Sequence, residues 1–387
     1  MDFKLESEHI QIRDAVRAFC QKEVAPYIEE WEKEEFFPRE LIRKMGELGF
    51  FSVAFPEKYG GTNLGWLAAA IVAEELGKAA LGVASCLNQQ SGTCPMTLLL
   101  NGNEAQKEKY IPGMISGKIL GCFAVTEPNA ATDVAGIQTT AIRQGDYYVL
   151  NGSKTWITHA SVFDAGICFA KTDPEQRHKG LSAFIIEKDM PGLSRSKIHD
   201  KLGCRCSDTG ELFFEDCKVP KENLIGEEGK GFDIAESSLL YGRVSVAARC
   251  QGVSDAAVEV AIKYAKSREQ FGQKIGNFQM IKQIIADMVA STEASRYLIY
   301  RAAWLLDQGL PARLETTIAK LVSSETALQT AIGAAKVHGA YTYSSELPVA
   351  RLYRDAMLNT AGEGTSNIQR IIIANHVLGL GRHRERE

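Results

Sequence analysis

The chain has 387 residues, of which 45% are hydrophobic and 24% are charged, and its formal net charge is −4. This composition is typical of a soluble globular protein, and the length predicts two or three domains. Basic residues form no block beyond the short stretch at 382–386, and they are not interleaved with aromatic residues. Nucleic-acid binding is therefore not favoured. No apolar run is long enough to span a membrane, so we expect no stable membrane insertion.

The first residues have neither the charged-then-apolar pattern of a secretory signal nor the Arg/Ser-rich composition of a transit peptide. We therefore expect a cytoplasmic protein of bacterial type. Nine cysteines are scattered along the chain, and only Cys204 and Cys206 lie close together. Without a second pair at metal-binding spacing, they predict free thiols in a reducing compartment and no metal site.

Helical periodicity predicts an N-terminal α-helical domain over residues 1–119. Pro26 marks a kink or break within its first helical stretch. The helical stretches are 11–34, 41–51, 66–76 and two short pieces between 98 and 115.

From about residue 120 the pattern changes to short β-rich runs, which predict a middle β-domain over 120–230. Turn signals at 144–146 and at Asn151-Gly152 separate the first runs, and the second is a strong hairpin signal. Short strands at close spacing predict a small antiparallel sandwich or barrel. The expected strands are 137–143, 147–150, 153–158, 167–171, 182–187, 196–201 and 210–214.

Long helical patterns then predict a C-terminal α-helical domain over 231–387, with the lengths of a four-helix bundle. The fold class is therefore α+β, in the order helical, antiparallel β, helical. The expected C-terminal helices are 232–270, 278–308, 314–338 and 368–379.

One carboxylate, Glu363, lies between Gly362 and Gly364, directly before the last predicted helix. Glycines let the backbone approach a ligand closely and adopt unusual angles. A carboxylate held there away from bulk water would have a raised pKa and act as a general base. The same pattern is also typical of a solvated turn.

Three further motifs offer ligand contacts. The stretch 123–133 combines small residues with the hydroxyls of Thr126 and Thr132, which suits a ligand or a surface loop. Trp156 on a predicted strand offers a flat surface for a ring system, or a core side chain. Arg268, at the end of a long helix, suits a phosphate or the helix dipole.

Several common sites are missing from the sequence. No G-x-G-x-x-G follows a strand and no G-x-x-x-x-G-K-[ST] occurs, so a nicotinamide Rossmann site or a P-loop is not expected. No H-E-x-x-H indicates a catalytic metal, and no G-x-S-x-G indicates a serine hydrolase.

Together and in this order, the motifs around Thr126, Trp156, Arg268 and Glu363 resemble the acyl-CoA dehydrogenase family over nearly the whole chain. The stretches 46–51 and 65–69 look like its glutaryl-CoA and alicyclic-carboxyl-CoA dehydrogenase branch. The resemblance implies an oxidoreductase with FAD as cofactor and an acyl-CoA substrate. It also implies a homotetramer, a dimer of dimers, and electron transfer to an electron-transferring flavoprotein.

The resemblance implies that Glu363 is the catalytic base, which removes the α-proton while the flavin takes the β-hydride to give the 2-enoyl-CoA. Some family members place the base at the position of Gly242, where glycine cannot act. The implied substrate contacts are Gln89, Thr132, Leu240, Tyr241, Arg243, Gly362 and Gly364.

The implied FAD contacts fall into two groups. Those within one subunit are Phe123, Val125, Thr126, Thr132, Trp156, Ile157, Thr158, Thr365 and Asn367. Those toward the FAD of a neighbouring subunit are Arg268, Gln270, Phe271, Gln279, Lys336, Val337, Gly339 and Ala340, and Phe278 is also expected at the cofactor.

Departures from the family pattern bear on the substrate. Gly362 stands where an aromatic residue often precedes the base, which predicts room for a branched, cyclic or otherwise bulky acyl group. Glutaryl-CoA dehydrogenases hold the distal carboxylate with an Arg near Ala84, and residues 82–86 contain none. A buried carboxylate without a partner is costly, so a glutaryl substrate is disfavoured. Gln89 and Gln90 can instead bind a polar, neutral substituent.

Four alternatives stay open at this point. One is a biosynthetic relative that oxidises an acyl group on a carrier protein, and another is a glutaryl-CoA-type dehydrogenase. A third is an oxidase that passes electrons to oxygen. The fourth is a flavin- or CoA-binding scaffold, against which the intact Glu363 argues.

Overall fold

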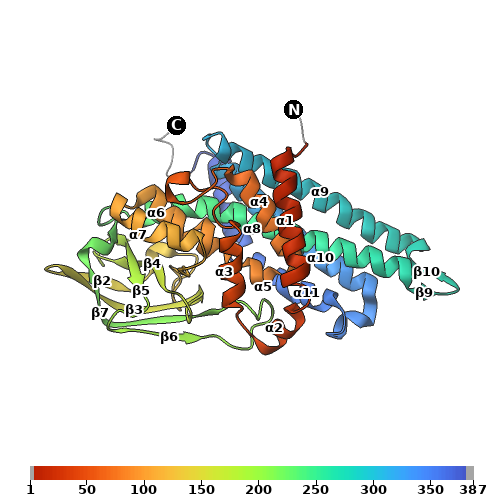
Figure 1. The fold of residues 1–387 in the computed structure, drawn as a ribbon, viewed down its shortest axis with the longest axis horizontal. Coiled ribbons are helices and arrows are strands. Elements are labelled where there is room, and N and C mark those ends of the chain that lie inside the picture. The colour runs from red at the N-terminus through yellow and green to blue at the C-terminus, as the bar shows by residue number, and fades with distance from the viewer. Residues whose placement is uncertain (1–3, 381–387) are drawn as a thin grey trace.

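The computed structural model describes residues 4–380, in which helices, then a β-sheet, then long helices follow one another along the chain (Figure 1). The chain breaks at Pro26, between the first two helices, as predicted. Asn103 begins α7 with a capping box in which it and Gln106 bond each other's backbone N–H. The elements before the sheet are α1 (Ser7–Glu23), α2 (Ile28–Glu34), α3 (Arg39–Glu47), η1 (Glu57–Tyr59), α4 (Gly65–Ala79), α5 (Leu81–Ala84), the π-helical turn η2 (Asn88–Gly92), α6 (Cys94–Asn101) and α7 (Glu104–Ile115).

The strands form one eight-stranded sheet in the order β6-β7-β3-β2-β4-β5-β8, with β1 beside β4. Most pairs are antiparallel, as predicted, but β4 runs parallel to β1 and, at one residue pair, to β2. The strand order is open, but the sheet folds over on itself: Tyr148 of β3 and Phe184 of β5, three strands apart in that order, have ring centroids 4.8 Å apart, as in the expected sandwich. The strands are β1 (Phe123–Ala124), β2 (Thr140–Gln144), β3 (Tyr147–Thr158), β4 (Ala165–Lys171), β5 (Leu181–Glu187), β6 (Leu193–Lys197), β7 (Thr209–Pro220) and β8 (Leu224–Ile225).

The hairpin predicted at Asn151-Gly152 is wrong, because β3 runs straight through both residues. The pairing of β3 with β7 shifts register between Leu150 and Gly152, so these residues make a bulge. Asn151 and Asp216 bond each other across the shift. A Cβ at Gly152 would lie 2.6 Å from Oγ1 of Thr139, the residue before β2, so this close approach requires glycine there.

The C-terminal helices are α8 (Gly231–Ser267), α9 (Gln279–Asp307), α10 (Arg313–His338), α11 (Pro348–Asn359) and α12 (Ser366–Val377). The prediction missed α11, which begins with proline in its first turn. Between α8 and α9 lies a small hairpin of β9 (Glu269–Gln270) and β10 (Gln273–Lys274). Figure 1 shows the large sheet at one end of the molecule and this hairpin at the other.

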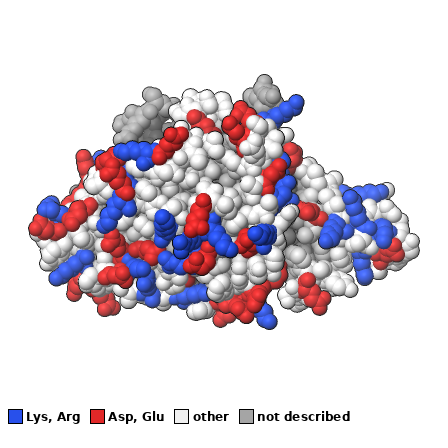
Figure 2. Space-filling model, in the orientation of Figure 1, with Lys and Arg blue, Asp and Glu red and all other residues white. Residues whose placement is uncertain are grey.

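Helix α8 packs against both α4 and α10 and is buried without a break from Gly242 to Ser254. It therefore joins the N-terminal helices to the C-terminal ones, and its two faces meet different partners. On the face drawn in Figure 2, acidic and basic side chains are interspersed, which is not the single-sign surface that nucleic acid requires.

Candidate functional site

Glu363 lies in the short loop between α11 and α12 and has a positive φ of +55°. A non-glycine residue rarely adopts this backbone conformation, so the surrounding bonds must hold it. Buried Lys320 on α10 donates through Nζ to Asn359 O at 3.0 Å and to Gly364 O at 2.7 Å. Gln369 Nε2 donates to the carbonyls of Glu363 and Gly364, each at 3.1 Å. Hydrogen bonds from α10 and α12 therefore hold this loop in place.

The Glu363 carboxylate faces two elements of the rest of the chain. Asn88 Nδ2, in η2, donates to Glu363 Oε1 at 2.6 Å. Glu363 Oε2 is buried and has no hydrogen-bond partner among residues 4–380. A Cβ on Gly242 of α8 would lie 3.0 Å from that oxygen. The glycine therefore leaves one carboxylate oxygen uncrowded and available.

The environment of Glu363 acts on its pKa in two directions. Burial raises the pKa above its usual value because the charged form loses water. The Asn88 hydrogen bond and the positive charges of Arg249, Arg243 and Lys320 oppose that rise. A raised pKa together with a buried, unbonded oxygen is what a carboxylate that accepts a proton from a ligand requires.

Other buried polar atoms near Glu363 also lack partners within the described chain. They include Asn88 Oδ1, Ser245 Oγ and Arg249 Nε. Buried polar atoms are nearly always hydrogen-bonded in folded proteins, so a cluster of unpaired ones points to a site that a polar ligand completes.

The predicted substrate contacts are spread over several elements. Tyr241 packs against Trp66 with ring centroids 4.7 Å apart, and Leu240 beside it is half-buried. Arg243 is buried, its Nη1 lies 3.4 Å from Thr317 Oγ1, and burial lowers its pKa. Gln89 is buried in η2, and its Oε1 has no partner within residues 4–380.

Two other expected substrate residues stand apart from this group. Gln90 is committed to structure: its Nε2 donates to Met114 O and Ile119 O, and its Oε1 accepts from Gly121 N. Thr132 is exposed in the loop after β1. Gly362 and Gly364 flank Glu363 directly.

The first group of expected cofactor residues surrounds an exposed indole. Trp156 on β3 is 63% exposed and has a positive φ of +59°. Thr155 N donates to Thr126 O at 2.9 Å, which ties β3 to the loop after β1. Buried Lys154 bonds Val125 O and pairs with Glu127 at 2.8 Å. The tied loop and the exposed ring form a rigid, flat platform that fits a planar ring system.

The remaining residues of this first group line the same region or another helix end. Phe123 and Ala124 form β1, and Ile157 is buried beside half-buried Thr158 on β3. Thr365 caps α12, where its hydroxyl accepts from Ile368 N, and Asn367 lies in that first turn.

The second group lies far from Trp156 within one chain. Arg268 ends α8, and its guanidinium lies 5.6 Å from the ring centre of Tyr341. Phe271 at the hairpin tip is 93% exposed and directly follows Gln270, its ring centre lies 6.0 Å from that of Phe278, and Gln279 begins α9. Figure 1 shows this hairpin and the sheet at opposite ends. The second group also contains Lys336 and Val337 at the end of α10, followed by Gly339 and Ala340.

Sequence reasoning missed Asn88, Ser245, Arg249 and Lys320. A signal existed for two of them, because Ser245 and Arg249 follow Gly242 by three and seven residues and so share its face of a helix. No local pattern marks Asn88 or Lys320, whose partners are distant in the sequence.

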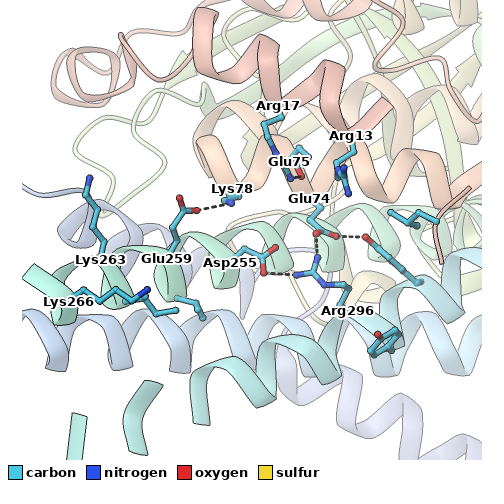
Figure 3. A pocket seen from close by; sticks show the side chains of 15 residues that line it. Arg13, Arg17, Glu74, Glu75, Lys78, Asp255, Glu259, Lys263, Lys266 and Arg296 are labelled. Carbon is cyan, nitrogen blue, oxygen red and sulfur yellow. Dashed lines mark hydrogen bonds and ion pairs between the residues drawn. The ribbon is translucent and has the colours of Figure 1, made fainter. Parts of the chain in front are cut away.

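A large surface cleft elsewhere is not the candidate site. It has a volume of about 830 Å³ and lies between α1, α4, α8 and α9. Figure 3 shows Arg296 between Glu74 and Asp255, with Lys78 paired to Glu259. Most of the charges that line this cleft are paired within the protein, and Glu363 is not among its lining residues.

Three absences can be stated for residues 4–380. No cluster of three or more His, Cys, Asp or Glu side chains could hold a metal ion. All nine cysteines are buried and unpaired, as expected for free thiols. No helix in this range has both the length and the apolar character needed to cross a membrane.

Comparison with known proteins gives matches along nearly the whole chain. Family models described as the N-terminal, middle and C-terminal domains of acyl-CoA dehydrogenase match residues 6–118, 122–217 and 229–378. The glutaryl-CoA dehydrogenase of Desulfococcus multivorans is 44% identical, with 98% of this chain and 99% of that protein covered.

Two solved structures extend the comparison. The butyryl-CoA dehydrogenase of Megasphaera elsdenii has a TM-score of 0.95 at 40% identity, covering 98% of this chain and all of the other. The FAD complex of PigA has a TM-score of 0.94 at 32% identity, with the same coverage.

Proposed function

Because this chain belongs to the acyl-CoA dehydrogenase family, we propose that it converts an acyl-CoA thioester with a short, branched or cyclic acyl group to the 2-enoyl-CoA. The observation that carries this proposal is the buried Glu363 carboxylate, which has one oxygen held by Asn88 and the other without a partner among residues 4–380. A general base needs one oxygen fixed and one available, in a place that excludes water.

Glu363 removes the proton from the α-carbon through Oε2, the oxygen that faces Gly242. Asn88 holds the other oxygen and so fixes the direction of the lone pair that accepts the proton. The tie from Lys320 keeps the strained loop in place during this step. The positive charges of Arg249 and Arg243 favour the ionised form of the base and so oppose the effect of burial on its pKa.

FAD, when bound, supplies the two-electron oxidant that accepts the hydride from the β-carbon. The exposed Trp156 platform, with Thr126 and Thr158 beside it, fits its isoalloxazine ring. Arg268 and Lys336 suit its phosphates as cations, but Arg268 directly precedes β9 and Lys336 lies at the end of α10, and Figure 1 shows β9 at the opposite end of the molecule from the sheet. We therefore propose that a second copy supplies them, in a homotetramer that is a dimer of dimers.

We further propose that the electrons pass to an electron-transferring flavoprotein and that the protein acts in the cytoplasm. Both proposals rest on the resemblance to the family.

Anaerobic titration of the purified protein with acyl-CoA thioesters, following the flavin absorbance, tests the proposed reaction. The panel contains linear, branched, dicarboxylic and alicyclic acyl groups. Bleaching by one class, abolished in Glu363→Gln, is the expected result. A protein that binds flavin but is bleached by none of the thioesters would contradict the proposal and favour a carrier-protein-bound substrate.

A further inference from the structure

The chamber around Glu363 contains more positive than negative charge. Arg243, Arg249 and Lys320 are all buried, and all three lie close enough to act on the Glu363 carboxylate. Within residues 4–380, none of the three has an ion pair with a carboxylate within 4 Å. Buried cations are normally paired, so this surplus suits a ligand that brings negative charge.

The two arginines are the least satisfied of these cations. Each has a buried Nε without a partner in the described chain and a single contact at 3.4 Å, from Arg243 Nη1 to Thr317 Oγ1 and from Arg249 Nη1 to Ala84 O. Lys320, in contrast, bonds two carbonyls at 3.0 Å or less. An arginine with a purely structural role would be expected to use more of its five donors.

Arg249 lies on the same stripe of α8 as the residue that faces the base. Gly242, Ser245 and Arg249 follow one another at helical spacing, so their side chains project from one face. Gly242 faces Glu363 Oε2, and a Cβ on Gly92 of η2 would lie 3.6 Å from Ser245 Cβ. Arg249 then approaches Ala84 at the end of α5.

The stripe of residues that faces α8 consists of Ala84, Asn88 and Gly92, which follow one another at intervals of four residues through α5 and η2. Asn88 bonds Glu363, Gly92 approaches Gly242 and Ser245, and Ala84 approaches Arg249. The two stripes are therefore antiparallel, and the unpaired atoms Asn88 Oδ1, Ser245 Oγ and Arg249 Nε lie along them.

The orientation of an acyl group along these stripes follows from burial. Leu239, Leu240 and Tyr241 on α8 are half-buried, whereas every residue from Gly242 to Ser254 is buried. An acyl group that enters beside Leu240 and places its α-carbon at Glu363 therefore directs its far end toward Arg249. Gly242, which faces Glu363, and Arg249 are roughly 10 Å apart along the axis of α8. The long arginine side chain can shorten this distance.

We propose that Arg249 binds a carboxylate at the distal end of the acyl group, so that the substrate is a short dicarboxylic acyl-CoA. This inference rests on the proposed function and names its substrate class. It also answers the argument against a glutaryl-type substrate, which relied on residues 82–86 containing no arginine. Arg249 Nη1 lies 3.4 Å from Ala84 O, so α8 brings a cation to the segment that contains no arginine of its own.

Paired substrates of equal length test the proposal. Glutaryl-CoA and pentanoyl-CoA both carry five-carbon acyl groups and differ in the distal carboxylate. Binding is measured by the shift in thermal unfolding and by the flavin spectrum, and reduction is measured anaerobically. The variants are Arg249→Gln, Arg249→Lys and, as a matched control, Arg43→Gln in the exposed i,i+4 pair with Glu47 on α3.

The wild-type protein is expected to bind glutaryl-CoA more tightly than pentanoyl-CoA. Arg249→Gln should reduce this preference at least about 30-fold, because a buried charge pair loses one partner. Arg249→Lys should retain part of it, and Arg43→Gln all of it. Thermal unfolding without ligand shows whether each variant is folded.

Equal binding of the two thioesters by the wild type, or a preference that survives in Arg249→Gln, would overturn the proposal. Because binding is measured separately from flavin reduction, a failure of the proposed reaction can be distinguished from a failure of the proposed role of Arg249. Selective binding that depends on Arg249 but leads to no flavin reduction would support the role of Arg249. It would contradict only the proposed dehydrogenase activity.

Discussion

Asn88 donates a 2.6 Å hydrogen bond to Glu363 across 275 positions of sequence. The bond joins η2, before the sheet, to the loop before the last helix, and α8 passes beside both residues. Burial of Glu363 favours its neutral form, and this bond favours its ionised form. Asn88 therefore sets both the direction and the protonation of the proposed base.

Replacing Asn88 with Ala should shift the pH dependence of flavin reduction to higher pH. The pKa of Glu363 would rise further above its usual value, because the ionised form loses its hydrogen bond. A bond to a charged group contributes about 1.5–3 kcal/mol, so the rate at pH 6 should fall at least about ten-fold more than the rate at pH 9. Asn101→Ala, which removes two side-chain bonds on α6, is the matched control. An equal loss at both pH values would show that Asn88 acts only on geometry.

Replacing Glu363 with Gln should remove turnover and raise stability at neutral pH. Loss of a general base typically costs 10²- to 10⁴-fold in rate, so a fall of about 10³-fold is expected. The folded-state pKa of Glu363 is above the usual 4.5, so the native state holds this proton more tightly than the unfolded state. Stability from this group is therefore full below pH 4.5 and is lost as pH rises through the folded-state pKa.

Thermal unfolding at two pH values checks the second part of that prediction. The gain in Tm of Glu363→Gln over the wild type should be larger at pH 8 than at pH 4, where both side chains are neutral. A gain that is the same at both pH values would mean that the carboxylate is not buried in the folded protein.

Replacing Lys320 with Met should destabilise the protein and lower activity together. The change leaves Asn359 O and Gly364 O without their donor inside the protein. Each buried, unsatisfied group costs about 1–3 kcal/mol, so about 2–4 kcal/mol should be lost in urea unfolding. Lys282→Met, at an exposed position on α9, is the control. Unchanged stability would show that the loop is held by Gln369 alone.

The sequence predicts the site best where a residue's neighbours in the chain decide its environment. Glu363 stands out because glycines flank it. Asn88 does not, because its partner is 275 residues away and its π-helical turn has no periodic pattern. Asn151-Gly152 misleads for the opposite reason, since the pairing of β3 with β2 and β7 overrides a local turn preference.

Replacing Arg268 with Gln should lower flavin content, although Arg268 directly precedes β9 and Trp156 lies on β3, strands at opposite ends of the molecule (Figure 1). The reason is that the proposed cofactor site contains residues from two copies. Bound flavin per subunit, measured with the molar mass in solution, checks this. The loss of a phosphate contact should weaken FAD binding about ten-fold or more. Full retention of flavin would contradict a shared site.

Replacing Gly362 with Tyr tests whether the space beside the base admits bulky acyl groups. A Cβ at Gly362 would meet only Leu358 O, at 3.6 Å, and its φ lies outside the left-handed range, so a side chain fits without backbone strain. The tyrosine ring would occupy space next to Glu363. Excess volume in a packed site costs about 1–3 kcal/mol, so kcat/KM for branched and alicyclic acyl-CoAs should fall about ten-fold or more relative to butyryl-CoA.

The control for this substitution places the same ring one residue earlier, in Ala361→Tyr, at an exposed position. Steady-state rates with linear, branched and alicyclic thioesters give the ranking for each protein. If Gly362→Tyr leaves the ranking unchanged, the acyl group does not extend past Gly362. The size limit would then lie along α8, between Gly242 and Arg249, where the two stripes of η2 and α8 face each other.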